Sequence, residues 1–284
     1  MTEPQLPFTG ERFTPECVRE MAYEHWHRYA LAAGLARGRR VLDAACGEGY
    51  GSAMLARAGA ASVLGVDLSA ATVAHASARY PLANLRFAEG DCTRLEGLPE
   101  GGFDLITSFE TLEHVQAQER MIERFASLLS PEGVVLVSSP DRRTYSELRG
   151  YRNEFHVREL DREELQALLG AYFPAVRLYG HKLLFQSAIW ALAAAEGRYR
   201  ATTAGGDADL VQGLAYAPLY YLAACARNEA ALQGLCELSL YGDAAESVYA
   251  HYDEQVRANI RAGHRIAELE RELERLRGDA TGRG

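Results

Sequence analysis

Apolar runs that are typical of buried strands alternate with helical patterns between about residues 39 and 180 of the chain. The last run, GVVLVSSP, is the most strand-like and is bounded by Gly133 and Pro140. Strands separated by helices are typical of a parallel sheet with crossover helices, so we predict an α/β domain. The strands are expected near residues 41–42, 63–66, 85–87, 103–106 and 133–140.

Apolar residues at helical spacing mark two of the helices. The pattern over 121–129 predicts a helix that ends before Pro131. The pattern over 165–169 predicts another, with Asp161 as its N-cap and Glu164 three residues later, close to a capping box. Two later apolar runs are expected to supply an antiparallel pair that closes the sheet, at 176–184 and 220–225.

Both ends of the chain carry helical patterns outside this alternating region. Before the first strand, an amphipathic helix is predicted from the spacing of Val18, Met21, Ala22, Trp26, Tyr29 and Ala33. After about residue 244 we predict one long charged helix with a thin apolar seam, formed by Ile266, Leu269, Leu273 and Leu276. The expected division is an N-terminal cap region (1–38), an α/β domain (39–243) with a surface insertion (196–213), and a C-terminal helix (244–284).

Composition limits the classes of function. The formal net charge of −9 argues against a broad nucleic-acid footprint, which needs a basic face, so no nucleic-acid partner is expected. The five cysteines are scattered, with neither metal-ligand spacing nor a disulfide framework, which favours a reducing cytoplasm. No apolar stretch is long enough to span a bilayer, and no signal core follows Met1. We expect a soluble, cytoplasmic protein.

The segment RRVLDAACGEGYGS (39–52) carries the strongest chemical signal. A strand runs into a loop with Gly47, Gly49 and Gly51, where a ligand can lie against bare main chain. A dinucleotide fingerprint would place its third glycine at Ser52, so the spacing disfavours an NAD-dependent oxidoreductase. Asp43 would repel a pyrophosphate but would suit a cationic sulfonium with its amino group. A plain tight turn between strand and helix is the alternative.

Acidic residues follow the next two strands. Asp67 ends the second strand, where a carboxylate can accept both hydroxyls of a ribose; helix capping is the other explanation, but Ser69 can do that. In EGDC (89–92), Asp91 is placed to accept the amino group of adenine and Cys92 to donate its backbone amide. A solvated loop aspartate is the alternative for Asp91.

Together these motifs resemble the class I S-adenosylmethionine-dependent methyltransferases, over roughly residues 8–185. The resemblance implies a Rossmann-like, seven-stranded, mostly parallel sheet with one antiparallel strand, and S-adenosyl-L-methionine as the cofactor. It implies that Ala45, Gly47 and Gly49 line the methionine part, that Asp67 holds the ribose, and that Leu68, Asp91 and Cys92 surround adenine. The segment GFDLITSFETLEHV (102–115) looks like the family's fourth-strand motif, in which Phe109 and Glu110 border the sulfonium.

Three further segments look like a bacterial branch of this family found beside glycosyltransferases in polysaccharide and glycan clusters. They are FTGERF (8–13), YEHWHRYA (23–30) and RNEFHVREL (152–160), and Glu154 stands where that branch often has Pro. We therefore expect O-methylation of a sugar hydroxyl on a glycan or glycosylated intermediate. The alternatives are N- or O-methylation of another small metabolite, and a non-catalytic cofactor-binding protein. The C-terminal helix is expected to serve self-association or to bind a glycosyltransferase partner.

Methyl transfer to an alcohol requires a group that takes the hydroxyl proton. His156 and His114 follow the fifth and fourth strands, at the carboxyl edge where open α/β sheets bind ligands. We expect His156 to be the base and keep His114 as second choice, the alternative for each being a structural imidazole. Arg28 is expected to pair with the carboxylate of the cofactor, unless it is only solvated.

Charged residues beyond the fifth strand have two interpretations. Asp141, Arg142, Arg143 and Tyr145 form either the floor of the acceptor pocket or a charged turn. Three carboxylates, Glu110, Glu113 and Asp141, could hold a divalent cation together with His114. No tight ligand motif supports this idea, so no metal site is predicted.

Overall fold

The computed structural model describes residues 20–186, 201–204 and 210–281. Its core is a seven-stranded sheet with the strand order β3-β2-β1-β4-β5-β9-β6. Neighbouring strands are parallel except at β9, which runs antiparallel to both β5 and β6. The prediction of one reversed strand is therefore confirmed. The strands are β1 (Arg40–Ala44), β2 (Ser62–Asp67), β3 (Leu85–Glu89), β4 (Phe103–Ser108), β5 (Leu129–Pro140), β6 (Ala175–His181) and β9 (Tyr220–Ala226).

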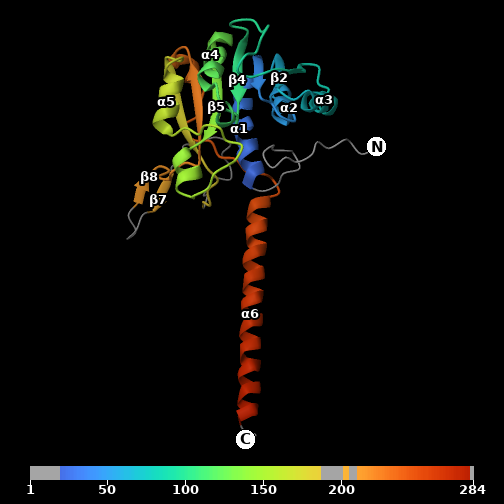
Figure 1. The fold of residues 1–284 in the computed structure, drawn as a ribbon, viewed down its shortest axis with the longest axis vertical. Coiled ribbons are helices and arrows are strands. Elements are labelled where there is room, and N and C mark those ends of the chain that lie inside the picture. The colour runs from blue at the N-terminus through green and yellow to red at the C-terminus, as the bar shows by residue number, and fades with distance from the viewer. Residues whose placement is uncertain (1–19, 187–200, 205–209, 282–284) are drawn as a thin grey trace, which may run out of the picture.

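Helices cover both faces of this sheet. The helices α1 (Glu20–Ala36) and α2 (Tyr50–Arg57) share one apolar cluster, while α4 (Gln118–Leu128) and α5 (Arg162–Gly170) share another. The helix α3 (Ala70–Arg79) packs on β3, and Figure 1 shows it beside α2. Strand β5 explains the two clusters, because Val134 and Leu136 enter one and Val135 and Val137 enter the other.

Most predicted boundaries agree with the structure. The capping box of α5 is present, with Asp161 and Glu164 each accepting from the other's backbone amide. The predicted closing pair is also present as β6 and β9. Strand β5 starts at Leu129, earlier than predicted, because Leu129 pairs with Phe103 before a register shift.

The last helix, α6 (Ser247–Thr281), extends away from the sheet domain (Figure 1). Its seam residues Ile266, Leu269, Leu273 and Leu276 are exposed. In the predicted insertion, β7 (Thr202–Ala204) and β8 (Leu210–Gln212) form an antiparallel pair, while 196–200 and 205–209 lie outside the described residues. Val18 and the segment 8–13 also lie outside them. Among the helices in the described ranges, none is long and apolar enough to cross a membrane.

Candidate active site

A pocket of about 420 Å³ lies where β1, β2 and β3 end. The chain leaves β1 and β4 toward opposite faces of the sheet, which is the place where open α/β sheets bind ligands. The wall contains five predicted cofactor residues, namely Ala45, Asp67, Leu68, Asp91 and Cys92. It also contains residues that follow β4, namely Thr111, His114, Val115, Gln116 and Ala117, and of these only His114 was predicted as a site residue.

The glycines of the loop after β1 have different structural roles. Gly47 has φ +54°, a Cβ there would meet nothing within 4 Å, and its amide donates to Asp67 Oδ2 at 3.0 Å. At Gly49, by contrast, a Cβ would lie 2.6 Å from the ring of Phe87. At Gly51 it would lie 2.0 Å from the ring of Tyr29. The main chain at Gly47 is thus open, whereas packing against Phe87 and Tyr29 requires glycine at positions 49 and 51.

Asp43 lies beneath the loop and is fully buried. Its carboxylate accepts hydrogen bonds from the hydroxyls of Ser52 at 2.6 Å, Thr107 at 2.8 Å and Tyr29 at 3.1 Å. Burial raises the pKa of Asp43 to about 6, although these hydroxyls act in the opposite direction. The structure thus places Asp43 inside a hydroxyl cage that joins α1, α2, β1 and β4, rather than on the pocket wall expected for a direct cofactor contact.

The carboxylate of Asp67 is oriented by two backbone amides. Oδ1 accepts from Ser69 N and Oδ2 from Gly47 N, both at 3.0 Å. The hydroxyl of Ser69 caps α3 by accepting from Thr72 N at 3.2 Å. Capping therefore belongs to Ser69, and the Asp67 carboxylate faces the pocket. Beside it, Leu68 is 73% exposed and offers an apolar surface.

Asp91 and Cys92 continue the wall after β3. Asp91 Oδ1 accepts from the amide of Thr93 at 2.8 Å and from its hydroxyl at 2.7 Å. Burial acts to raise the pKa of Asp91, but these hydrogen bonds outweigh it and hold the pKa below its usual value. The thiol of Cys92 lies 4.0 Å from Met121 Sδ, against the core.

Glu110 follows β4 in a strained conformation, with φ +50°. Its amide donates to Ser138 Oγ at 3.0 Å, and that hydroxyl donates to Glu110 Oε1 at 2.7 Å. Phe109 is buried, and its ring packs edge-on against Tyr29 with centroids 5.0 Å apart. Phe109 is thus a core side chain, while Glu110 points toward α1.

Arg28 of α1 is buried, with 2% of its surface exposed, so the interpretation of a solvated arginine is wrong. Its guanidinium lies 4.6 Å over the ring of Tyr220 and 3.4 Å from Glu110 Oε1. Within the described ranges, none of its three nitrogens has a hydrogen-bond partner. A buried guanidinium whose N–H donors have no acceptor costs folding free energy, and the carboxylate of a ligand would accept hydrogen bonds from it.

Three further residues, which were not predicted as site residues, lie around Arg28. Burial raises the pKa of Glu24, while Arg28 acts to lower it. Burial and Arg28 lower the pKa of His181 to about 2. Tyr220 completes the group. Glu24 lies one helical turn before Arg28 on α1, whereas His181 and Tyr220 come from β6 and β9, which no local pattern could have placed beside Arg28.

His156 is predicted to be the base, and both its ring nitrogens are engaged. Nδ1 lies 2.5 Å from Glu159 Oε1, and Nε2 accepts from Asn153 Nδ2 at 3.0 Å. The ring also stacks on Tyr145. A proton can reach Nε2 only after Asn153 moves. His114 lies on the pocket wall and donates from Nδ1 to Phe155 O at 3.0 Å.

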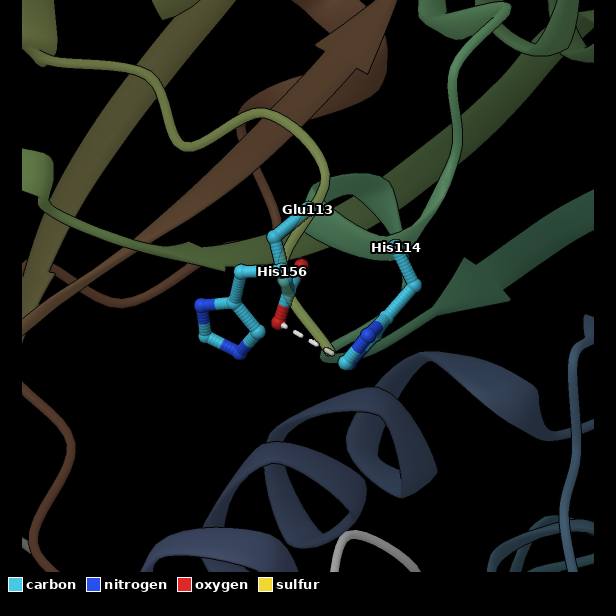
Figure 2. A group of neighbouring side chains, drawn as sticks. All are labelled: Glu113, His114 and His156. Carbon is cyan, nitrogen blue, oxygen red and sulfur yellow. Dashed lines mark ion pairs between the residues drawn. The ribbon is translucent and has the colours of Figure 1, made fainter. Parts of the chain in front are cut away.

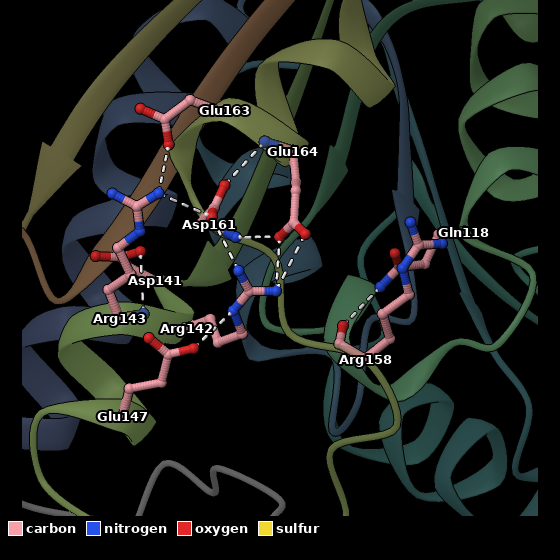
Figure 3. A network of polar contacts seen from close by, with 9 residues as sticks. All are labelled: Gln118, Asp141, Arg142, Arg143, Glu147, Arg158, Asp161, Glu163 and Glu164. Carbon is pink, nitrogen blue, oxygen red and sulfur yellow. Dashed lines mark hydrogen bonds and ion pairs between the residues drawn. The ribbon is translucent and has the colours of Figure 1, made fainter.

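The arginines after β5 form a charged turn rather than a pocket floor. Arg142 pairs with Asp161 at 2.9 Å and with Glu164 at 2.9 Å, and Arg143 pairs with Asp161 at 3.1 Å (Figure 3). Asp141 is buried and accepts from the hydroxyl of Thr144. Tyr145, the fourth residue of this group, differs from the other three, because its ring stacks on the ring of His156.

Residues 41–133 match a family model described as a methyltransferase domain. A probable S-adenosylmethionine-dependent methyltransferase of Mycolicibacterium smegmatis is 41% identical over 167 residues, 58% of this chain and 63% of that protein. A ubiquinone biosynthesis O-methyltransferase of Neisseria meningitidis is 36% identical over 115 residues, 39% of this chain and 48% of that protein. The chain thus spans less than two thirds of either relative.

The fold is shared with solved structures. The YcgJ protein of Bacillus subtilis superposes with a TM-score of 0.52 at 21% identity, over 72% of this chain and all of that one. At this identity the likeness concerns the fold alone. Sheet order, pocket and family match agree: residues 41–133 are similar to a methyltransferase domain.

Proposed function

We propose that the protein transfers a methyl group from S-adenosylmethionine to a hydroxyl group of a small acceptor. The observation that carries this proposal is the pocket at the ends of β1, β2 and β3, whose wall combines a carboxylate, Asp67, with the exposed apolar side chain of Leu68. A nucleoside needs both, one for its ribose hydroxyls and one for its base.

The donors and acceptors around the pocket fit the remaining parts of the cofactor. Asp67 would accept from the ribose hydroxyls, because its two backbone hydrogen bonds leave further lone pairs on each oxygen. Leu68, Asp91 and Cys92 would surround adenine. Ala45 and Gly47 would lie against the methionine part, and Arg28 would pair with its carboxylate.

The cofactor supplies the methyl group on a sulfonium that already carries its leaving group. The protein therefore has to align the acceptor oxygen with the methyl carbon and accept one proton. Beside Glu110, the rings of Tyr145, His156, Tyr220 and His181 form a continuous chain of contacts that we assign to the acceptor. His156 is proposed as the base and His114 as the alternative.

A sugar hydroxyl is the acceptor that we propose. Its support is the resemblance of segments 23–30 and 152–160 to methyltransferases of glycan clusters, and both segments contribute to the site through Arg28 and His156. Aromatic rings with polar edges also suit an acceptor that has apolar and hydroxylated faces. A phenolic hydroxyl is the second candidate, favoured by the identity with the ubiquinone biosynthesis O-methyltransferase.

The test is transfer of a labelled methyl group from S-adenosylmethionine to panels of hydroxylated sugars, nucleotide-linked sugars and catechols. Label in a sugar product, stable to base as an ether, supports the proposal. Label confined to catechols would replace the sugar by the second candidate. The variant His156→Ala should lower kcat by about a hundredfold. Failure of S-adenosylhomocysteine to bind the protein at all would refute the proposal.

A further inference from the structure

Two imidazoles and a carboxylate meet beside the pocket. Figure 2 shows Glu113 between His114 and His156, and one potential ligand atom of each residue lies within 4.8 Å of the others. Neither Glu110 nor Asp141 belongs to this cluster in the described part of the chain. The cluster therefore differs from the carboxylate set that the sequence alone suggested.

Hydrogen bonds between two loops bring the cluster together. The amides of Val157 and Arg158 donate to Glu113 O at 2.8 and 3.1 Å. The side chain of Gln118 donates to the carbonyls of Leu112 and Arg158, both at 2.8 Å, and its bond to Arg158 is drawn in Figure 3. The loop after β5 is thus tied to the loop after β4, with His156 held beside Glu113.

Both rings are oriented as in metal-bound histidines. His114 Nδ1 lies 3.0 Å from Phe155 O, and because a carbonyl only accepts, Nδ1 carries the proton. His156 Nδ1 faces Glu159 Oε1 in the same way. In both residues the lone pair is therefore on Nε2. Metal-ligating histidines characteristically donate their other ring nitrogen to a carbonyl or carboxylate.

The side chain of Glu113 supplies an independent indication of a ligand site. Its side chain is 1% exposed, and Oε2 is buried with no hydrogen-bond partner in the described part of the protein. A buried carboxylate oxygen without a partner is costly. The other oxygen, Oε1, lies 4.0 Å from His114 Nε2, and a cation that both carboxylate oxygens bind beside the imidazoles would remove that cost.

We propose that Glu113, His114 and His156 bind a divalent transition-metal ion of the zinc type. Two nitrogens and one carboxylate oxygen are the ligand set of an open zinc site, in which the fourth position takes water or substrate. Ligand atoms on one zinc ion lie about 3.3 Å apart. The potential ligand atoms of the three side chains, which lie within 4.8 Å of one another, must therefore approach by up to about 1.5 Å. Binding also requires Nε2 of His156 to exchange the amide of Asn153 for the metal.

The open position adjoins the cofactor pocket, because His114 lies on its wall. A metal-bound acceptor hydroxyl loses its proton more easily, so the ion would take the place of a free histidine base. This role rests on the proposed function. The metal site itself does not, and it can be tested without cofactor or acceptor.

The experiment titrates chelator-treated protein with Zn²⁺ by calorimetry and with Co²⁺ by visible absorption. We expect one equivalent to bind, with the absorption of a low-coordinate Co²⁺ ion. The variants Glu113→Gln, His114→Ala and His156→Ala should each weaken Zn²⁺ binding at least tenfold. The control His264→Ala, on exposed α6, should bind like wild type.

A second variant keeps the test decisive if a ligand variant fails to fold. Glu159→Gln conserves shape and deletes no ligand, but removes the charge that orients His156. It should weaken Zn²⁺ binding about tenfold or more, as loss of such a partner does. No metal binding by wild type, or unchanged affinity in Glu159→Gln and the ligand variants, overturns the proposal. Methyl transfer without metal binding would leave the proposed function standing.

Discussion

Replacing Arg28 by Met gives the sharpest test of the cofactor site. Arg28 is 2% exposed, and all three of its guanidinium nitrogens lack a hydrogen-bond partner within the described structure. If the carboxylate of the cofactor occupies this fork, the change removes charge-assisted hydrogen bonds worth about 1.5–3 kcal/mol each. Loss of even one such bond, about 1.5–3 kcal/mol, would raise the Kd of S-adenosylhomocysteine about 10- to 140-fold.

The assay has to separate binding from stability. Without Arg28, the carboxylates Glu110 and Glu24 lose their buried counter-charge, which by itself can destabilise the fold. The Kd should therefore be measured by calorimetry well below the melting temperature. The matched ligand is 5′-methylthioadenosine, which has the nucleoside and the sulfur but no carboxylate.

We expect Arg28→Met to lose affinity for S-adenosylhomocysteine and to bind methylthioadenosine as wild type does. The matched protein control is Arg40→Met, since Arg40 begins β1 at the opposite edge of the sheet and pairs with Asp104 at 2.9 Å. An equal loss for both ligands would mean that Arg28 supports the pocket only indirectly. Unchanged affinity for both would refute the assignment of the carboxylate to Arg28.

Three other predictions follow from the loop, its buried carboxylate and the last helix. Gly47→Ala should weaken S-adenosylhomocysteine binding, with little loss of stability beyond the strain at φ +54°. Gly49→Ala should instead lower the melting temperature, because its Cβ would collide with Phe87. A larger fall in melting temperature for Gly47→Ala than for Gly49→Ala would contradict the packing argument. The pKa of Asp43 is about 6 in the fold and 3.8 ordinarily, so the folded state binds the proton more tightly. This group should therefore lower the free energy of unfolding by about 2 kcal/mol as pH rises from 4 to 6. Denaturant titrations of wild type and Asp43→Asn check this, and an equal slope in both would contradict it. Truncation after residue 245 should leave cofactor binding intact and abolish any dimer seen by light scattering, because α6 exposes its apolar seam. A monomeric wild-type protein at high concentration would count against self-association.

Local features of the sequence determined the elements of the fold. Apolar runs such as 133–140 predicted buried strands, because a strand covered on both faces needs apolar residues at successive positions. Asp161 and Glu164 predicted the start of α5, because capping involves only residues within one turn. The loop after β1 and the acidic end of β2 predicted the ligand edge, because a parallel sheet brings the carboxyl ends of its strands together.

Only the tertiary structure decided what the polar side chains of that edge do. Asp43 was predicted to face the cofactor, but hydroxyls from α1, α2 and β4 enclose it. Arg28 is buried because β9, distant in sequence, passes beneath α1. His156 meets Glu113 only because two loops share backbone hydrogen bonds. Periodicity and capping act over a few residues, whereas burial and hydrogen-bond partners depend on strand order, which brings distant segments into contact.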